Sequence, residues 1–188
     1  MTVIAALAHD GQVFMASDNV ATGNRAYQVT NSKIHQNGPL LIGLSGSVVV
    51  SDIIEHGWTP PSRAHGESAE RFLAWTVSRS LRTLLREQAH VSTDRDGEYV
   101  NLNALIGYEG RLYYLSTEFS VLSLTAPFEA IGCGSDYAMG VLYAYSRMDG
   151  AARPSPEEQL TRAVEAACQF DVHCAPPIHH HASPRSGT

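Results

Sequence analysis

The second residue of the chain, Thr2, carries a hydroxyl group in a position that suits catalysis. An alcohol is a weak nucleophile and needs an adjacent base. Removal of Met1 would give Thr2 a free α-amine, whose ordinary pKa of about 7.7 to 8.0 suits a base near neutral pH. Taken alone, a threonine here is explained equally simply as a β-strand residue. The surrounding residues must therefore decide whether Thr2 is a nucleophile.

Two charged residues strengthen the catalytic interpretation. A lysine beside an α-amine disfavours a second positive charge and stabilises negative charge developing on the hydroxyl oxygen. Lys33 is the single lysine of the chain, and Asp18 ends an apolar segment and could hold it ionised and oriented. The alternatives are a solvated surface lysine and an aspartate that ends a strand and caps a turn. The two residues together favour a buried ion pair.

The order and spacing of these residues resemble those in the catalytic β subunits of proteasomes and in the bacterial HslV peptidase. The resemblance covers Thr2, the segment MASDNVAT at 15–22, Lys33, and the segment GLSGS at 43–47. In that family an aspartate on a strand precedes Ala-Thr, and a lysine lies close to the nucleophile. Random placement of a single lysine at this one position has a chance of about one in two hundred.

Two later segments extend the resemblance to nearly the whole chain. The segment AIGCGSDYAMGVL at 130–142 is similar to the family's Gly-Ser-Gly-Ser signature and the helix after it. The segment DVHC at 171–174 lies where the family has an aspartate followed three residues later by a serine. The resemblance is weakest over 58–95 and after 176.

The resemblance implies a threonine-type peptidase of the N-terminal nucleophile (Ntn) hydrolase class. In it, the Thr2 hydroxyl attacks an amide, the α-amine acts as base, and the N–H of Gly46 stabilises the oxyanion. A glycine that starts a helix would have the same geometry, so the two interpretations of Gly46 do not exclude each other. The implied catalytic residues are Thr2, Asp18, Lys33, Gly46, Asp171, Cys133 and Cys174.

Two cysteines depart from the family pattern. Cys133 and Cys174 stand where the family has two serines that lie near the nucleophile. A thiol is a weaker hydrogen-bond donor and acceptor than a hydroxyl, so the network around Asp171 would be looser, or tuned to another pH. The alternative is a tolerated substitution by small buried thiols. We expect the two sulfurs to approach each other beside Thr2, which would permit a redox role.

The resemblance also implies a pocket for the side chain that precedes the cleaved bond. This pocket is mostly apolar with a polar edge, which indicates a preference for apolar side chains. The implied substrate-binding residues are Ala21, Thr22, Asn31, His35, Leu44, Val48 and Asp52.

Apolar patterning and turn dipeptides predict an α+β fold. Strands are predicted at 3–8, 12–17, about 29–35, 40–44, 102–108, 111–116 and 128–131. Helices are predicted at about 45–56, 67–89, 135–145 and 155–170. The order of strands, two helices, strands and two helices suits two stacked antiparallel sheets flanked by helix pairs. This is a four-layer αββα Ntn-hydrolase sandwich.

The chain is predicted to form a single Ntn-hydrolase domain over 1–178, followed by a mobile tail over 179–188 that contains histidines and prolines. His173 and the run 179–181 could ligate a metal, but adjacent histidines in such a segment more often form an adventitious site. Three cysteines without a C-x-x-C pair indicate reduced thiols and no disulfide framework. We expect neither a metal nor another cofactor.

Composition excludes several classes of partner. The net charge of -6 and the pI of about 5.8 argue against binding to nucleic acid or to an anionic membrane. The sequence has no apolar run of membrane-spanning length and no recognisable secretory signal, so we expect a cytoplasmic protein.

The expected substrate is a peptide or an unfolded protein, degraded within a homo-oligomeric ring that an ATP-dependent unfoldase could feed, as the resemblance implies. Two alternatives stay open. One is a proteasome-like structural subunit whose catalysis has decayed. The other is a stand-alone Ntn amidase that acts on a small molecule or a modified peptide.

Overall fold

Two antiparallel sheets form the centre of the molecule. The computed structural model describes residues 2–22 and 24–185. The first sheet, in the spatial order β12-β1-β2-β13, consists of β1 (Val3–His9), β2 (Gln12–Ser17), β12 (Phe128–Gly132) and β13 (His179–Ala182). The second, in the order β11-β10-β9-β6-β5, consists of β5 (Ile34–Asn37), β6 (Leu40–Gly46), β9 (Leu102–Tyr108), β10 (Arg111–Leu115) and β11 (Val121–Ser123).

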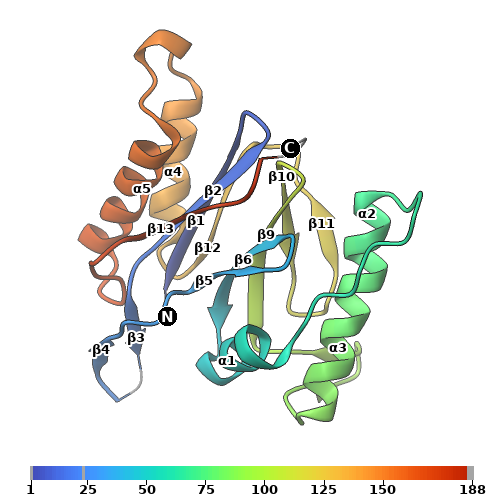
Figure 1. Cartoon of the computed structure of the whole chain (residues 1–188). Helices are drawn as coiled ribbons and strands as arrows, with labels where there is room; N and C mark the ends of the chain where they lie inside the picture. The colour runs from blue at the N-terminus through green and yellow to red at the C-terminus, as the bar shows by residue number, and fades with distance from the viewer. Residues whose placement is uncertain (1, 23, 186–188) are drawn as a thin grey trace.

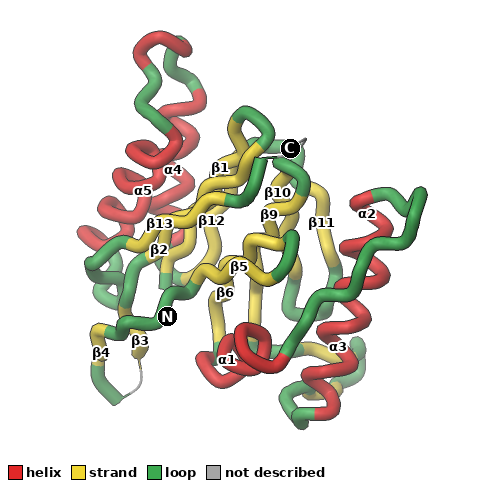
Figure 2. The backbone as a smooth tube through the Cα atoms, in the orientation of Figure 1, coloured by secondary structure: helices red, strands yellow, loops and turns green. Residues whose placement is uncertain are grey.

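Helices cover the outer face of each sheet (Figure 1). The first sheet is covered by α4 (Ser135–Ser146) and α5 (Pro156–Phe170). The second is covered by α1 (Val48–Gly57) and by a continuous helical run of α2 (Ala69–Arg71), the π-helical segment η1 (Phe72–Val77) and α3 (Ser78–Glu87). Figure 2 shows the same four layers as a tube. The predicted αββα sandwich is confirmed.

The remaining elements are short and lie outside the two main sheets. They are the strand pairs β3 (Val20–Thr22) with β4 (Ala26–Gln28) and β7 (Ser92–Thr93) with β8 (Glu98–Tyr99), and the 3-10 turn η2 (Gly150–Ala152). The β3–β4 hairpin occupies a stretch for which the sequence predicted no regular structure. None of the described helices has the length and apolar character needed to cross a bilayer.

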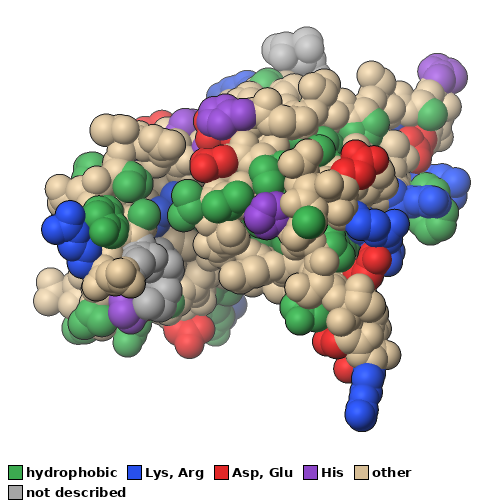
Figure 3. Space-filling view, turned by 90° about the horizontal axis from the view of Figure 1, so that it is seen from below, with side chains coloured by type: hydrophobic (Ala, Val, Ile, Leu, Met, Phe, Trp, Pro, Cys, Tyr) green, Lys and Arg blue, Asp and Glu red, His purple; other side chains and the backbone are tan. Residues whose placement is uncertain are grey.

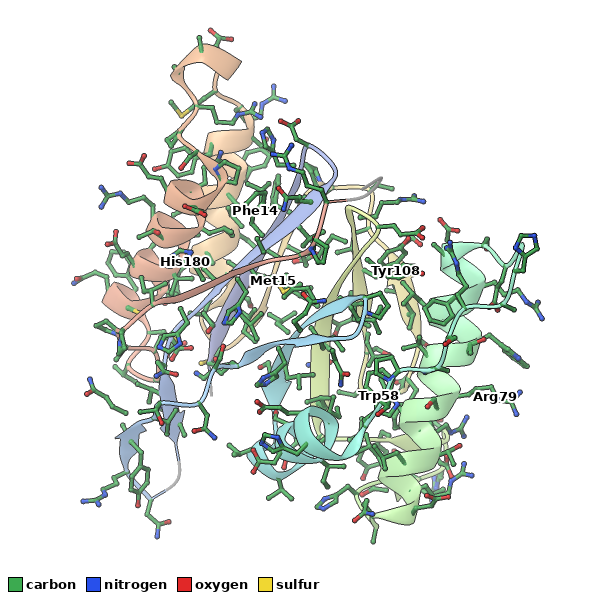
Figure 4. All side chains as sticks on the ribbon, in the orientation of Figure 1. Phe14, Met15, Trp58, Arg79, Tyr108 and His180 are labelled. Carbon is green, nitrogen blue, oxygen red and sulfur yellow. The ribbon has the colours of Figure 1, made fainter. Side chains whose placement is uncertain are left out.

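The apolar core has three layers because successive strand residues point to opposite faces. In β1, Val3, Ala5 and Leu7 pack against α4 and α5, whereas Ile4 and Ala6 pack between the sheets. On β2, Phe14 lies on the helix side and Met15 lies between the sheets (Figure 4). The second sheet packs against its own helices through a third cluster that includes Trp58 and Tyr108 (Figure 4). Apolar packing on both faces of β1 thus fixes the start of this strand, which Thr2 immediately precedes.

Two-residue turns close the predicted hairpins. Asp10 and Gly11 join β1 to β2 with φ angles of 46° and 71°, and Glu109 and Gly110 join β9 to β10 with φ angles of 48° and 70°. Such turns match the right-handed twist of the adjoining strands. The Ser155 hydroxyl caps the start of α5, because it accepts the N–H of Glu158.

The sequence predicted that the domain ends at Ile178 and that a mobile tail follows. This prediction is wrong for the first residues of that tail, which belong to the fold. His179–Ala182 form β13 and pair with β2, in the register His179 to Ser17. The Ser183 hydroxyl then accepts the N–H of Val13 at 2.9 Å. Backbone pairing of an open sheet edge does not need apolar side chains, and for that reason composition did not predict this strand. The last three residues of the predicted tail, 186–188, lie outside the described part.

Candidate active site

Thr2 immediately precedes β1, and only 3% of its surface is exposed. Its hydroxyl donates a hydrogen bond of 2.7 Å to Oδ1 of Asp18. The same oxygen accepts the backbone N–H of Val3 at 2.9 Å, and Oδ2 accepts the N–H of Val20 at 3.2 Å. Asp18 is fully buried, so these donors replace the water that would otherwise solvate the carboxylate.

Lys33 completes this arrangement. Its Nζ lies 2.7 Å from Oδ1 of Asp18, and its side chain is 14% exposed. Lys33 and the Thr2 hydroxyl therefore meet at one carboxylate oxygen. The predicted pairing of Asp18 with Lys33 is present in the structure. The direct bond from Thr2 to Asp18 was not predicted, because sequence position does not show which way a hydroxyl points.

Backbone pairing places the three residues together. Asp18 directly follows β2, and its N–H donates to the carbonyl of Val3 across the β1–β2 hairpin. The carbonyl of Lys33 accepts the N–H of Leu44, which ties the segment before β5 to β6. The carboxylate and the ammonium thus come from rigid neighbours of β1.

The sequence suggested that Gly46 starts a helix. In the structure it is instead the last residue of β6. Its φ is 140°, and a Cβ atom added here would lie 2.3 Å from the carbonyl oxygen of Asn101. Ser47 is the N-cap residue of α1, and its N–H donates to that same carbonyl. Only glycine fits this position, because it has no side chain. Gly46 and Thr2 line one pocket.

The turn over Gly132, Cys133 and Gly134 packs against the backbone carbonyl of Thr2. The Thr2 carbonyl accepts the N–H of Gly134 at 3.4 Å and the thiol of Cys133 at 3.3 Å. A Cβ atom at Gly132, whose φ is 95°, would lie 2.1 Å from the same carbonyl. The segment matched to the family's Gly-Ser-Gly-Ser signature therefore packs directly on Thr2.

Asp171, Cys133 and Cys174 come together beside this turn. The two sulfurs are 3.9 Å apart, and the sulfurs and a carboxylate oxygen of Asp171 all lie within 4.8 Å of one another. The expected approach of the two thiols is present, as a contact without a disulfide. Burial is the main cause that raises the pKa of both thiols, and for Cys133 a hydrogen bond to Asp171 raises it further. Both sulfurs are therefore protonated thiols near neutral pH.

A pocket of about 200 Å³ opens beside Thr2. Six of the seven residues that the resemblance implies for substrate binding line it: Ala21, Asn31, His35, Leu44, Val48 and Asp52. The seventh, Thr22, belongs to β3, and its side chain lies outside the described part of the structure. Lys33 also lines the pocket, so the pocket joins the Thr2–Asp18–Lys33 cluster to the surface.

One face of α1 forms the acidic side of this pocket. Val48, Ser51, Asp52 and Glu55 have the spacing of a single helix face, and all four line the pocket. Sequence reasoning missed Ser51 and Glu55, although helical spacing from Val48 and Asp52 could have found them. His35 Nδ1 lies 3.3 Å from Glu55, but burial is the main cause that lowers the pKa of His35. Burial therefore disfavours a positive charge on His35, and Glu55 also contacts His56, whose Nε2 lies 3.6 Å from Oε2.

Figure 3, seen from below, shows hydrophobic, histidine and acidic side chains near the middle of this face. Lys and Arg side chains lie mainly toward its two ends, where acidic side chains also lie. The histidine run in β13 does not join the pocket lining. His180 contacts the hydroxyl of Thr161 on α5, and His181 contacts that of Ser32.

Neither a protein-family model nor a curated protein sequence matches the chain. Solved structures do. Eukaryotic HslV from Trypanosoma brucei aligns with a TM-score of 0.65 and 19% identity, covering 96% of this chain and 98% of that chain. Anbu (ancestral beta-subunit) from Yersinia bercovieri aligns with a TM-score of 0.66 and 15% identity, covering 97% and 82%. The fold is thus the proteasome- and HslV-like Ntn-hydrolase fold.

A further structure aligns with a higher TM-score. Thiobacillus denitrificans BPH covers all of both chains, with a TM-score of 0.79 and 24% identity. The same protein in complex with epoxomicin aligns with a TM-score of 0.78 and 22% identity. At these identities the likeness establishes the fold of the chain, whereas its chemistry must be argued from its own residues.

Proposed function

We propose that this chain is a threonine-type amide-bond hydrolase related to proteasome β subunits and HslV. The observation that carries the proposal is the meeting of Thr2 and Lys33 at the buried carboxylate of Asp18, both at 2.7 Å. A fully buried carboxylate with an ammonium partner is costly to maintain for stability alone. Here it lies at the edge of an open pocket that suits a peptide side chain.

The proposed reaction needs only groups of this chain and water. Once Met1 is removed, the Thr2 oxygen attacks the substrate carbonyl carbon while the α-amine takes the hydroxyl proton. The N–H of Gly46 stabilises the oxyanion, and collapse of the intermediate returns the proton to the leaving amine. Water then hydrolyses the threonyl ester with the α-amine as base. Asp18 orients Lys33 through the 2.7 Å contact, and the positive charge of Lys33 disfavours a second positive charge on the α-amine.

The α-amine exists only after removal of Met1, which lies outside the described residues. Removal of Met1 thus stays a prediction that mass spectrometry can test directly. An epoxyketone such as epoxomicin reacts with both the hydroxyl and the free amine of an N-terminal threonine. We expect intact protein that lacks Met1 to gain the mass of one epoxomicin molecule, located on Thr2 by peptide mapping.

The controls are Thr2→Ala and Thr2→Ser. We expect no adduct with Thr2→Ala and a retained adduct with Thr2→Ser, because serine keeps a hydroxyl next to an amine. Retained Met1, or an absent adduct in protein that lacks Met1, would contradict the proposal and favour a decayed structural subunit.

We further propose that copies of the chain assemble in a ring and act on peptides or unfolded protein. Large apolar side chains are exposed on α4, at the end of α5 and in the turn after it; Tyr143, Phe170 and Val172 have exposed fractions of 61%, 67% and 89%. Exposed apolar patches commonly mark protein interfaces. Light scattering and electron microscopy would test assembly, and a monomer active on small amides would favour the stand-alone amidase. The unfoldase partner and the cytoplasmic location stay predictions.

A further inference from the structure

The two thiols beside Thr2 have a spacing that matches metal binding better than oxidation. Two sulfurs bound at about 2.3 Å to one tetrahedral zinc ion lie about 3.8 Å apart. Cys133 and Cys174 lie 3.9 Å apart. A disulfide would require about 2.0 Å, so oxidation would have to pull the two chain segments together. The existing backbone therefore already holds the sulfurs as a metal-bridged pair would need them.

We propose that Cys133, Asp171 and Cys174 form a binding site for a thiophilic divalent cation such as zinc. Thiolates and a carboxylate are both established zinc ligands. Three protein ligands leave the fourth tetrahedral position open to water or to another group. The inference adds to the proposed hydrolase, and only its inhibitory consequence depends on that function.

The fold prepares the three ligands before any ion arrives. The turn from Asp171 to Cys174 is closed by a backbone hydrogen bond of 3.1 Å between the carbonyl of the first and the N–H of the second. The N–H of His173 donates to Oδ1 of Asp171 at 2.8 Å, which orients the carboxylate. Hydrogen bonds of this kind to metal ligands fix their geometry and strengthen binding.

Access and support come from opposite sides of the site. Cys133 is exposed, whereas Cys174 is buried with 4% of its surface accessible. A cation can thus reach the site from solvent through Cys133 and be bound by Cys174, which the core holds in place. The Gly132–Gly134 turn, which packs on the Thr2 carbonyl, fixes Cys133. Any ion bound here lies beside the nucleophile's own residue.

A bound cation would inhibit the proposed reaction. To bind the ion, Cys133 must give up the proton that it donates to the Thr2 carbonyl, so the hydrogen bond of 3.3 Å on that side of Thr2 is lost. The cation also engages Asp171, which the resemblance to the peptidase family implies is part of the catalytic network.

The direct test is a titration of the reduced, chelator-treated full chain with Co²⁺. Thiolate ligation gives an intense near-ultraviolet charge-transfer band, whereas histidine ligation does not, which separates this site from the histidines of β13. We expect a saturable band at one ion per chain that disappears when Zn²⁺ is added. Loss of a group that only hydrogen-bonds to a metal ligand lowers affinity by up to about 100-fold. Cys133→Ser and Cys174→Ser each remove a ligand itself, so each should weaken binding by at least about 100-fold.

Cys168→Ser is the matched control, because Cys168 is the third cysteine and lies outside the cluster. It should keep the full band, and circular dichroism should confirm that every variant is folded. Absence of the band in the unmodified chain, or an undiminished band in the Cys133→Ser and Cys174→Ser double variant, would overturn the proposal.

A second measurement addresses inhibition separately. Zn²⁺ should slow epoxomicin adduct formation, a chelator should restore it, and Cys174→Ser should abolish the effect of zinc. Equal zinc sensitivity in that variant would refute inhibition through this site. The cobalt spectrum does not require catalysis, so it decides the metal site whatever becomes of Thr2. Adduct formation without added metal decides the proposed hydrolase.

Discussion

The two sides of Thr2 are built from different chemistry. On one side, the Thr2 hydroxyl and the Lys33 ammonium each donate to Oδ1 of Asp18 at 2.7 Å, and that carboxylate is fully buried. On the other, the Cys133 thiol donates to the Thr2 carbonyl at 3.3 Å, and its sulfur lies 3.9 Å from that of Cys174. Charge-assisted hydrogen bonds are about twice as strong as neutral ones, and thiols are weak partners. The charged side therefore fixes the nucleophile, whereas the thiol side can accept another ligand.

Loss of the lysine charge should have the largest effect on reactivity. We expect Lys33→Met to slow epoxomicin adduct formation by about 10²–10³-fold, similar to the loss of one preorganised electrostatic contact in other enzymes. Intact-mass spectrometry over time measures the rate. Arg25→Met removes an exposed cation between β3 and β4 and should leave the rate unchanged. Equal rates for Lys33→Met and the unmodified chain would show that the charged side does not activate Thr2.

Loss of the aspartate charge should have the largest effect on stability. Asp18→Asn removes one partner of a buried ion pair and should lower the free energy of unfolding by about 3–5 kcal/mol. Urea unfolding measures the change, and the exposed Asp149→Asn is the control. The Asp18→Asn and Lys33→Met double variant should recover part of the loss, because no uncompensated charge remains. A change below that of the control would contradict the assigned burial.

Restoring hydroxyls on the thiol side should have a smaller effect. We expect the Cys133→Ser and Cys174→Ser double variant to form the epoxomicin adduct about fivefold faster, the equivalent of one ordinary hydrogen bond. The same mass assay measures it, with Cys168→Ser as control. A change larger than that caused by Lys33→Met would reverse the proposed ranking of the two sides.

The pocket next to the charged side should favour cationic substrates modestly, in place of the apolar preference expected from sequence. Asp52 and Glu55 line it, and Glu55 is 31% exposed. Partly exposed ion pairs contribute about 1 kcal/mol or less, so Glu55→Gln should reduce the preference for arginine over leucine before the cut by about fivefold or less. Paired fluorogenic peptides measure this ratio. An unchanged ratio in Glu55→Gln would exclude Glu55 as a specificity residue.

The smallest effect concerns thiol reactivity. Burial and the contact with Asp171 raise the pKa of Cys133, so its thiolate is scarce at pH 7.5 although the residue is exposed. We expect iodoacetamide to modify Cys133 more slowly than it modifies the thiol of glutathione. The rate for Cys133 should keep increasing as the pH is raised beyond about 8.5, the ordinary thiol pKa. Peptide mapping resolves the site. Faster modification than glutathione at pH 7.5 would mean that the thiol side is charged.

Sequence predicted the αββα layers and the meeting of Asp18 with Lys33, because apolar periodicity and conspicuous residue types carry that information. It did not predict the bond from Thr2 to Asp18, which depends on a side-chain rotation. It also missed Glu55, which helical spacing could have revealed. The β3–β4 hairpin and β13 escaped because their pairing rests on backbone hydrogen bonds and leaves little apolar signal.

The strand β13 has a consequence for how the chain acquires its fold during synthesis. It closes the edge of the first sheet beside β2, and the bond between Val13 and Ser183 joins residues 170 positions apart. While the ribosome makes the intervening residues, the edge of β2 has no such cover. Open strand edges invite pairing with other chains. The nascent protein thus passes most of its synthesis with an exposed edge that only a late segment can close.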